Sequence, residues 1–256
     1  MKKTLAIANI IALVVTIAVN YVSNTGMLNG NTMKTISDKY HNYFTPAGYA
    51  FSIWGLIYLG LLGFVIYTAA NINKQHNSNA VLLQVKWWFV ISCLANSLWV
   101  IAWLSDYIGL SVIIMSVIFI SLFNIIVNTG ASLGRHPFKT HLLVFWPFAI
   151  YFGWISVAFI ANTAAYLTAT GWDGWGISDI NWTVIMIAAA GLVNILVIWT
   201  RRLHLFGAVG IWALLAIAAS NDNSLIVNAC YVVSAVLSVV IIARILIVGK
   251  NKTLVA

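Results

Sequence analysis

Glutamate is absent from this chain of 256 residues, and its acidic residues are five aspartates. Charged residues make up 7% of the sequence, whereas a soluble globular domain carries about 25%. With so few charges, most of the folded surface must face something other than water. The composition therefore excludes an ordinary soluble domain.

Cysteine is also scarce, and no metal-binding spacing of cysteine and histidine occurs. The two cysteines, Cys93 and Cys230, both lie inside apolar runs, where we expect buried thiols. We predict neither a disulfide framework nor a metal site. The five histidines fall in loops or at the ends of apolar runs. We expect them at the interface or in solvent, and haem ligation is the alternative.

The centres of the apolar runs lack ionisable side chains. Arg244 lies near one end of the last run, where its long side chain can reach the membrane interface. Proton-coupled transport, voltage sensing and a retinal Schiff base all need ionisable groups at depth, so the sequence argues against them. It also contains no Ser/His/Asp arrangement, paired carboxylates or phosphate-binding glycine loop. The residues alone therefore predict no catalytic group.

Apolar residues, in contrast, make up 62% of the chain, in runs such as 110–127 and 142–161. Runs of about 20 residues match the thickness of a bilayer as helices, whereas a membrane β-barrel would need alternating segments of about 10 residues. We predict an all-α, polytopic transmembrane bundle of about eight spans: 5–22, 49–70, 87–104, 107–129, 141–165, 182–199, 203–219 and 224–248.

Basic and acidic residues fall on opposite sides of the membrane when the loops between these spans are assigned in alternation. If the amino terminus is cytoplasmic, all of the 13 basic residues except Lys34 and Lys39 fall inside, and every aspartate falls outside. This follows the positive-inside rule, so the net charge of +8 indicates topology and not nucleic acid as a partner. We expect an integral protein of the bacterial inner membrane, with a retained first span and both termini cytoplasmic.

Aromatic and amide side chains recur at helical spacing in three of the spans. Phe51, Trp54 and Tyr58 share one face of the second span, and the third span carries Asn96 and Trp99. The fifth carries a stripe of four: Tyr151, Trp154, Ala158 and Asn162. Aromatic walls, a small residue and a few amides suit a flat apolar ligand with polar edges. Packing between helices is the alternative for each residue.

The same segments resemble the TspO/MBR family, the tryptophan-rich sensory or translocator proteins. The second span, entered at Pro46, matches the family's Trp-x-x-x-Tyr with Trp54 and Tyr58, and the fifth span matches its Tyr-x-x-Trp-x-x-x-Ala-x-x-x-Asn in full. There are departures: one proline stands before the second-span motif where the family usually has two, and Pro147 precedes Tyr151 by four residues.

The resemblance implies a five-helix ligand-binding bundle over residues 1–165, with 166–256 as an additional three-helix transmembrane extension. It implies binding of porphyrin, other tetrapyrroles, sterols or similar flat hydrophobic molecules, with no required cofactor, and possible homodimers in the lipid. Pro46, Trp54, Asn96, Trp154 and Ala158 would line the pocket, and loop 23–48 would form a lid. The expected function is sensing or carrying such a ligand. The alternatives are a uniporter-like transporter or scaffold, and an enzyme that slowly photo-oxidises porphyrin at Trp54 and Trp154.

Overall fold

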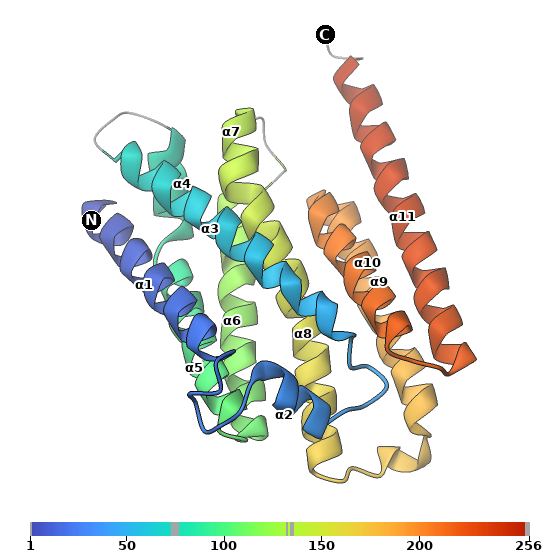
Figure 1. The fold of residues 1–256 in the computed structure, drawn as a ribbon. Coiled ribbons are helices and arrows are strands. Elements are labelled where there is room, and N and C mark those ends of the chain that lie inside the picture. Colours follow the sequence, from blue (N-terminus) through green and yellow to red (C-terminus); the bar gives the residue numbers. More distant parts are fainter. Residues whose placement is uncertain (1, 73–76, 132, 134–135, 254–256) are drawn as a thin grey trace. The chain divides into compact units, whose positions relative to one another are not determined.

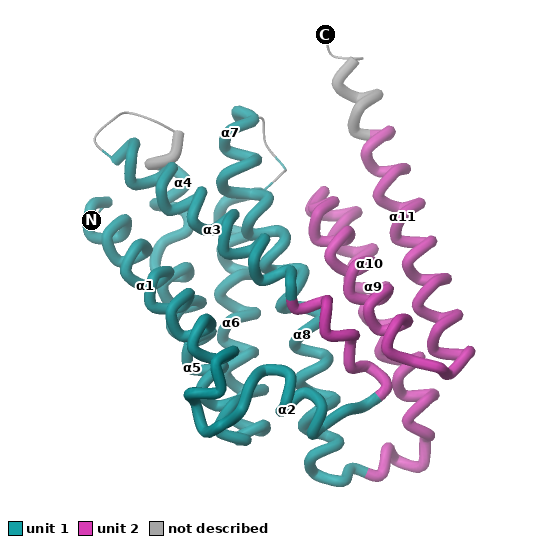
Figure 2. Tube along the Cα trace, viewed as in Figure 1, with its two compact units in different colours: residues 1–42, 52–172 teal, residues 43–51, 173–256 magenta. Residues whose placement is uncertain are grey.

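The structure is a computed structural model that describes residues 2–72, 77–131, 133 and 136–253. Every regular element in these ranges is a helix, which confirms the predicted all-α class (Figure 1). The chain divides into two compact units, residues 1–42 with 52–172 and residues 43–51 with 173–256 (Figure 2).

The first unit is built on five apolar helices, which contact one another in a closed ring. In the order around the ring, α1 packs on α3, α3 on α8, α8 on α6, α6 on α5, and α5 on α1. Their bounds are α1 (Lys2–Val22), α3 (Ile53–Ala70), α5 (Trp88–Leu104), α6 (Ile108–Thr129) and α8 (Trp146–Ala169). Side chains on the inner faces of α3, α5 and α8 can therefore meet, as the predicted site requires.

Three short helices complete this unit: α2 (Met33–Lys39), α4 (Asn77–Val85) and α7 (Phe138–Thr140). Helix α4 lies between the second and third predicted spans and packs on both α1 and α6. Leu82 of α4 is fully buried against Leu5 and Ala6 of α1. Burial of this apolar face stabilises a helix of nine residues that would be marginal alone.

The junction between α7 and α8 brings α3 and α8 close together. Residues 141–145 form a π-helical turn (η2) just before Pro147, whose missing N–H prevents a regular helical bond at this point. A Cβ added at Gly60 of α3 would lie 3.0 Å from Pro147, and one at Gly63 would lie 3.1 Å from Leu143. These glycines let α3 approach the start of α8, one turn before Tyr151.

The second unit is a bundle of three helices that all contact one another: α9 (Asp179–Arg201), α10 (His204–Ala219) and α11 (Ser224–Thr253). A short 3-10 helix, η3 (Gly174–Gly176), precedes them. The segment 43–51, which includes most of the 3-10 helix η1 (Gly48–Ser52), also belongs to this unit. Ala47 N donates to Ala216 O at 2.9 Å, and Trp212 Nε1 donates to Ala50 O at 3.3 Å.

In the part of the chain that the structure describes, six helical stretches are long and apolar enough to cross a membrane. They are 2–22, 48–70, 108–129, 138–169, 179–201 and 224–247, and they match six of the predicted spans to within a few residues. The other two predicted spans form apolar helices of 17 residues (α5) and 16 residues (α10). The structure is that of an integral membrane protein with a polytopic helical bundle.

Candidate functional site

Four aromatic rings from α3 and α8 meet around Trp54. The Trp54 ring stacks on Tyr58 with centroids 5.5 Å apart and planes at 21°. Tyr151 and Trp154 meet the same ring edge-on, at 5.8 and 6.5 Å between centroids. Offset stacking and edge-to-face contacts are the favoured geometries of aromatic pairs, so the cluster is well packed. The structure thus brings together four of the residues that the sequence singled out.

The cluster has a partly open layer and a buried layer. Trp54 and Tyr58 are half-buried, whereas Tyr151 and Trp154 are 2% and 3% exposed. The buried rings hold the half-buried pair in place, and the half-buried pair offers ring surface that a further molecule can cover. The hydroxyl oxygen of Tyr58 is itself buried and has no hydrogen-bond partner. A polar edge of a bound molecule would satisfy it.

An amide relay links this cluster to α1 and α5. Asn96 is fully buried and accepts a hydrogen bond from Asn20 Nδ2 at 2.8 Å. It donates through Nδ2 to the Tyr151 hydroxyl at 3.2 Å. The sequence analysis missed Asn20, although its spacing of four from Thr16 places both polar side chains on one face of the first span. Thr16 Oγ1 donates to Cys93 O at 3.0 Å, which fixes α1 against α5 at this level.

A second polar cluster, formed by Trp99, Ser111 and Asn162, joins α5, α6 and α8. Trp99 Nε1 donates to Asn162 Oδ1 at 2.6 Å, and Asn162 Nδ2 donates to Ser111 Oγ at 2.8 Å. Trp99 also stacks on Trp103, with ring centroids 6.0 Å apart. Both predicted residues, Trp99 and Asn162, are therefore bonded to each other across two helices and not to the rings around Trp54.

The remaining predicted residues lie apart from these clusters or outside the first unit. Ala158 is half-buried on α8, one turn after Trp154. Pro46 and Phe51 belong to the second unit. Within the first unit, the site therefore comprises Trp54, Tyr58, Asn96, Tyr151 and Trp154, together with Asn20.

The loop after α1 is fastened to the turn that follows α5. Four of its side chains bond to residues 104–106 of that turn: Asn29, Asn31, Lys39 and Tyr40. Lys39 pairs with Asp106, and this hydrogen bond lowers the pKa of the Asp106 carboxyl and raises the pKa of Lys39. Both groups are largely exposed, so the contribution of the pair to stability is small.

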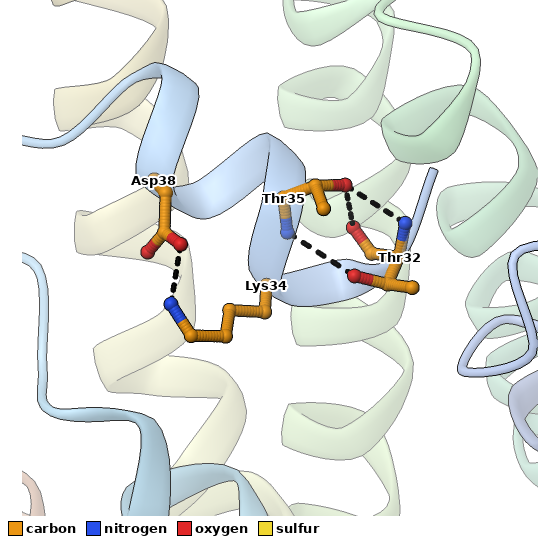
Figure 3. A network of polar contacts seen from close by, with 4 residues as sticks. All are labelled: Thr32, Lys34, Thr35 and Asp38. Carbon is orange, nitrogen blue, oxygen red and sulfur yellow. Dashed lines mark hydrogen bonds and ion pairs between the residues drawn. The ribbon is translucent and has the colours of Figure 1, made fainter. Parts of the chain in front are cut away.

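Helix α2, within the same loop, is stabilised locally (Figure 3). Thr32 and Thr35 form a reciprocal capping box at its start, and Lys34 pairs with Asp38 one turn along. Ile36, its buried residue, is 2% exposed, and α2 packs on α5. The loop is thus structured and packs on the end of α5 that precedes Ser105, and it is not a free coil.

Three comparisons with known proteins bear on this arrangement. Residues 6–243 match the family model described as TSPO-like protein. The match includes the helices after residue 165, which lie beyond the motifs that carry the resemblance. No curated protein and no solved structure matches the chain.

Proposed function

The chain belongs to the TSPO-like family of membrane sensory and binding proteins, and we propose that it binds a tetrapyrrole or a similar flat hydrophobic molecule on the Trp54–Tyr58 ring pair. The observation that carries the proposal is the convergence of four rings and a buried amide from α3, α5 and α8 in one place. Stacking on half-buried rings would supply the affinity.

The polar groups of the site would orient the ligand. The unpartnered Tyr58 hydroxyl can donate to a carboxylate or accept from a ring N–H, because a phenol does both. The fully buried Asn96 is held by Asn20 and Tyr151, so it serves to fix the Tyr151 ring. The loop fastened at Asp106 would act as a cover from the outer side, and both termini would be cytoplasmic, as the sorting of charge indicates.

The test is titration of protoporphyrin into the full chain in detergent, followed by porphyrin absorbance and by tryptophan quenching. We expect Trp54→Ala to weaken binding roughly tenfold, because one stacking surface is lost. Tyr58→Phe keeps the ring and removes the hydroxyl, so a smaller loss is expected. Trp87→Ala is the matched control, because Trp87 is an exposed tryptophan outside the cluster. Equal affinity of the Trp54→Ala and Trp87→Ala proteins would exclude this site.

A further inference from the structure

Three basic side chains gather at one end of the second unit, outside the site described above. The three helices approach closely at Gly207 of α10, where an added Cβ would lie 2.5 Å from Ile198 Cδ1 of α9 and 3.1 Å from Ile241 Cδ1 of α11. His204 precedes Gly207 by three residues and Arg244 follows Ile241 by three, so each lies one turn from this contact.

Helix direction places these residues at the same end of the bundle. Helix α9 ends at Arg201, and α10 begins at His204, so Arg202 lies in the connection between them. Helix α11 returns antiparallel to α10 after a short turn at residues 220–223 and brings Arg244 back to that end. The Arg244 guanidinium carbon stands 5.3 Å from the Trp199 ring centroid.

One buried nitrogen in each of these three side chains has no hydrogen-bond partner. Nε of Arg202, Nε of Arg244 and Nε2 of His204 are buried and have no hydrogen-bond partner. In the part of the chain that the structure describes, both ion pairs involve lysines of the first unit, and none involves these arginines. The aspartates of the second unit lie elsewhere, since Asp173 precedes η3, Asp179 begins α9, and Asp222 lies in the turn between α10 and α11.

Such an arrangement differs from basic residues that only set membrane topology. Those residues need no convergence, and they keep their charged groups in water. Here two guanidinium groups and an imidazole come from three elements, each with one nitrogen withdrawn from water, and no carboxylate among the described residues pairs with them. The first backbone N–H groups of α10, which has no side-chain cap, add further donors at the same end.

We propose that Arg202, His204 and Arg244 form a binding site for a phosphate group, either the phosphodiester of an acidic phospholipid or a free phosphate. Guanidinium forks match phosphate oxygens, and basic pockets between membrane helices on the cytoplasmic side suit lipid head groups. Trp199, which is half exposed beside Arg244, would pack against the glycerol and the start of the acyl chains.

The experiment uses the full chain in an uncharged detergent with added phosphatidylglycerol, phosphatidylcholine or inorganic phosphate. Retained lipid is counted by native mass spectrometry, and thermal unfolding is recorded in parallel. We expect phosphatidylglycerol to be retained in preference to phosphatidylcholine. In the double variant Arg202→Gln, Arg244→Gln, phosphatidylglycerol should bind about tenfold more weakly.

The matched control is Lys86→Gln, Lys139→Gln, which removes the same charge from exposed lysines of the first unit. It should bind phosphatidylglycerol within about twofold of the unchanged protein. The variant Arg202→Lys, Arg244→Lys keeps both positive charges but loses the bidentate geometry of the guanidinium groups. We expect its loss of phosphatidylglycerol affinity to lie between those of the other two double variants. Displacement of phosphatidylglycerol by millimolar phosphate would support the site with a free phosphate as its ligand. The proposal would be overturned if Arg202→Gln, Arg244→Gln and Lys86→Gln, Lys139→Gln lost equal affinity for phosphatidylglycerol. It would also be overturned if the unchanged protein retained the two lipids equally and phosphate had no effect.

Discussion

Asn96 and Asn162 are both almost fully buried amides of the first unit, yet they play different parts in it. Asn96 bonds to the Tyr151 hydroxyl, and Tyr151 packs on Trp54, so two side chains link Asn96 to the proposed ligand. Asn162 bonds to Trp99 and Ser111 and is occupied by helix-to-helix bonds. A membrane helix pair gains about 0.6 kcal/mol from such a bond on average.

These contacts predict a split between two variants. Asn162→Ala should lower the free energy of unfolding in detergent by about 1 kcal/mol, because Trp99 Nε1 loses its acceptor, and it should leave porphyrin affinity within about twofold. Asn96→Ala should lower both the free energy of unfolding and the affinity for porphyrin, because the Tyr151 ring is no longer held. Thermal unfolding and porphyrin titration of the two proteins check this. Equal loss of affinity in both variants would contradict the division into two clusters.

At the scale of elements, the loop after α1 meets the turn after α5 partly through the Lys39–Asp106 ion pair. The lowered pKa of Asp106 means that its contribution is complete above the ordinary carboxyl value of 3.8 and is lost as pH falls through the lowered pKa. The raised pKa of Lys39 means that its contribution is complete below 10.5 and is lost as pH rises through the raised pKa. The ion pair should therefore add to the hold on the loop from about pH 4 to pH 10.

We predict that Asp106→Asn loosens the loop throughout this range without detaching it, because Asn29, Asn31 and the buried Ile36 still hold it. Backbone amides of residues 29–41 should then exchange hydrogen faster at pH 7, while amides of α6 keep their rates. The control is Asp38→Asn, which removes the pair with Lys34 inside α2 but no contact to the turn. Hydrogen exchange followed by mass spectrometry measures both. If the loop of the Asp106→Asn protein exchanged as slowly as that of the Asp38→Asn protein, the ion pair would not be what fastens it.

For the whole molecule, the long apolar helices could be predicted from composition because membrane thickness dictates their length. The meeting of α3 and α8 at Trp54 was predictable in part, because spacing assigns side chains to a face, although spacing does not say which faces meet. Membership of segment 43–51 in the second unit was not predictable. It rests on backbone contacts such as Ala47 N to Ala216 O, which leave no periodic trace in the sequence.

The number of crossings is the remaining question at this scale, and it depends on α5 and α10. At 1.5 Å per residue, helices of 17 and 16 residues span about 25 Å, slightly less than a typical hydrocarbon core of about 30 Å. Local thinning of the bilayer at modest cost can accommodate this difference. If both helices cross and the amino terminus is cytoplasmic, every aspartate lies outside. If α5 did not cross, the turn before α6 would lie inside and the segment after α6 would lie outside.

We therefore predict that α5 crosses the membrane, and cysteine variants test this. Tyr107→Cys, in the turn before α6, should react with an impermeant thiol reagent from outside intact cells, and Lys139→Cys should react only after the membrane is opened. Both positions are exposed, and the native Cys93 and Cys230 are buried, so background labelling is low. Labelling of Lys139→Cys and of Met27→Cys from outside, with Tyr107→Cys protected, would show that α5 does not cross, because the loop after α1 would then keep its side while α6 and α8 reversed theirs.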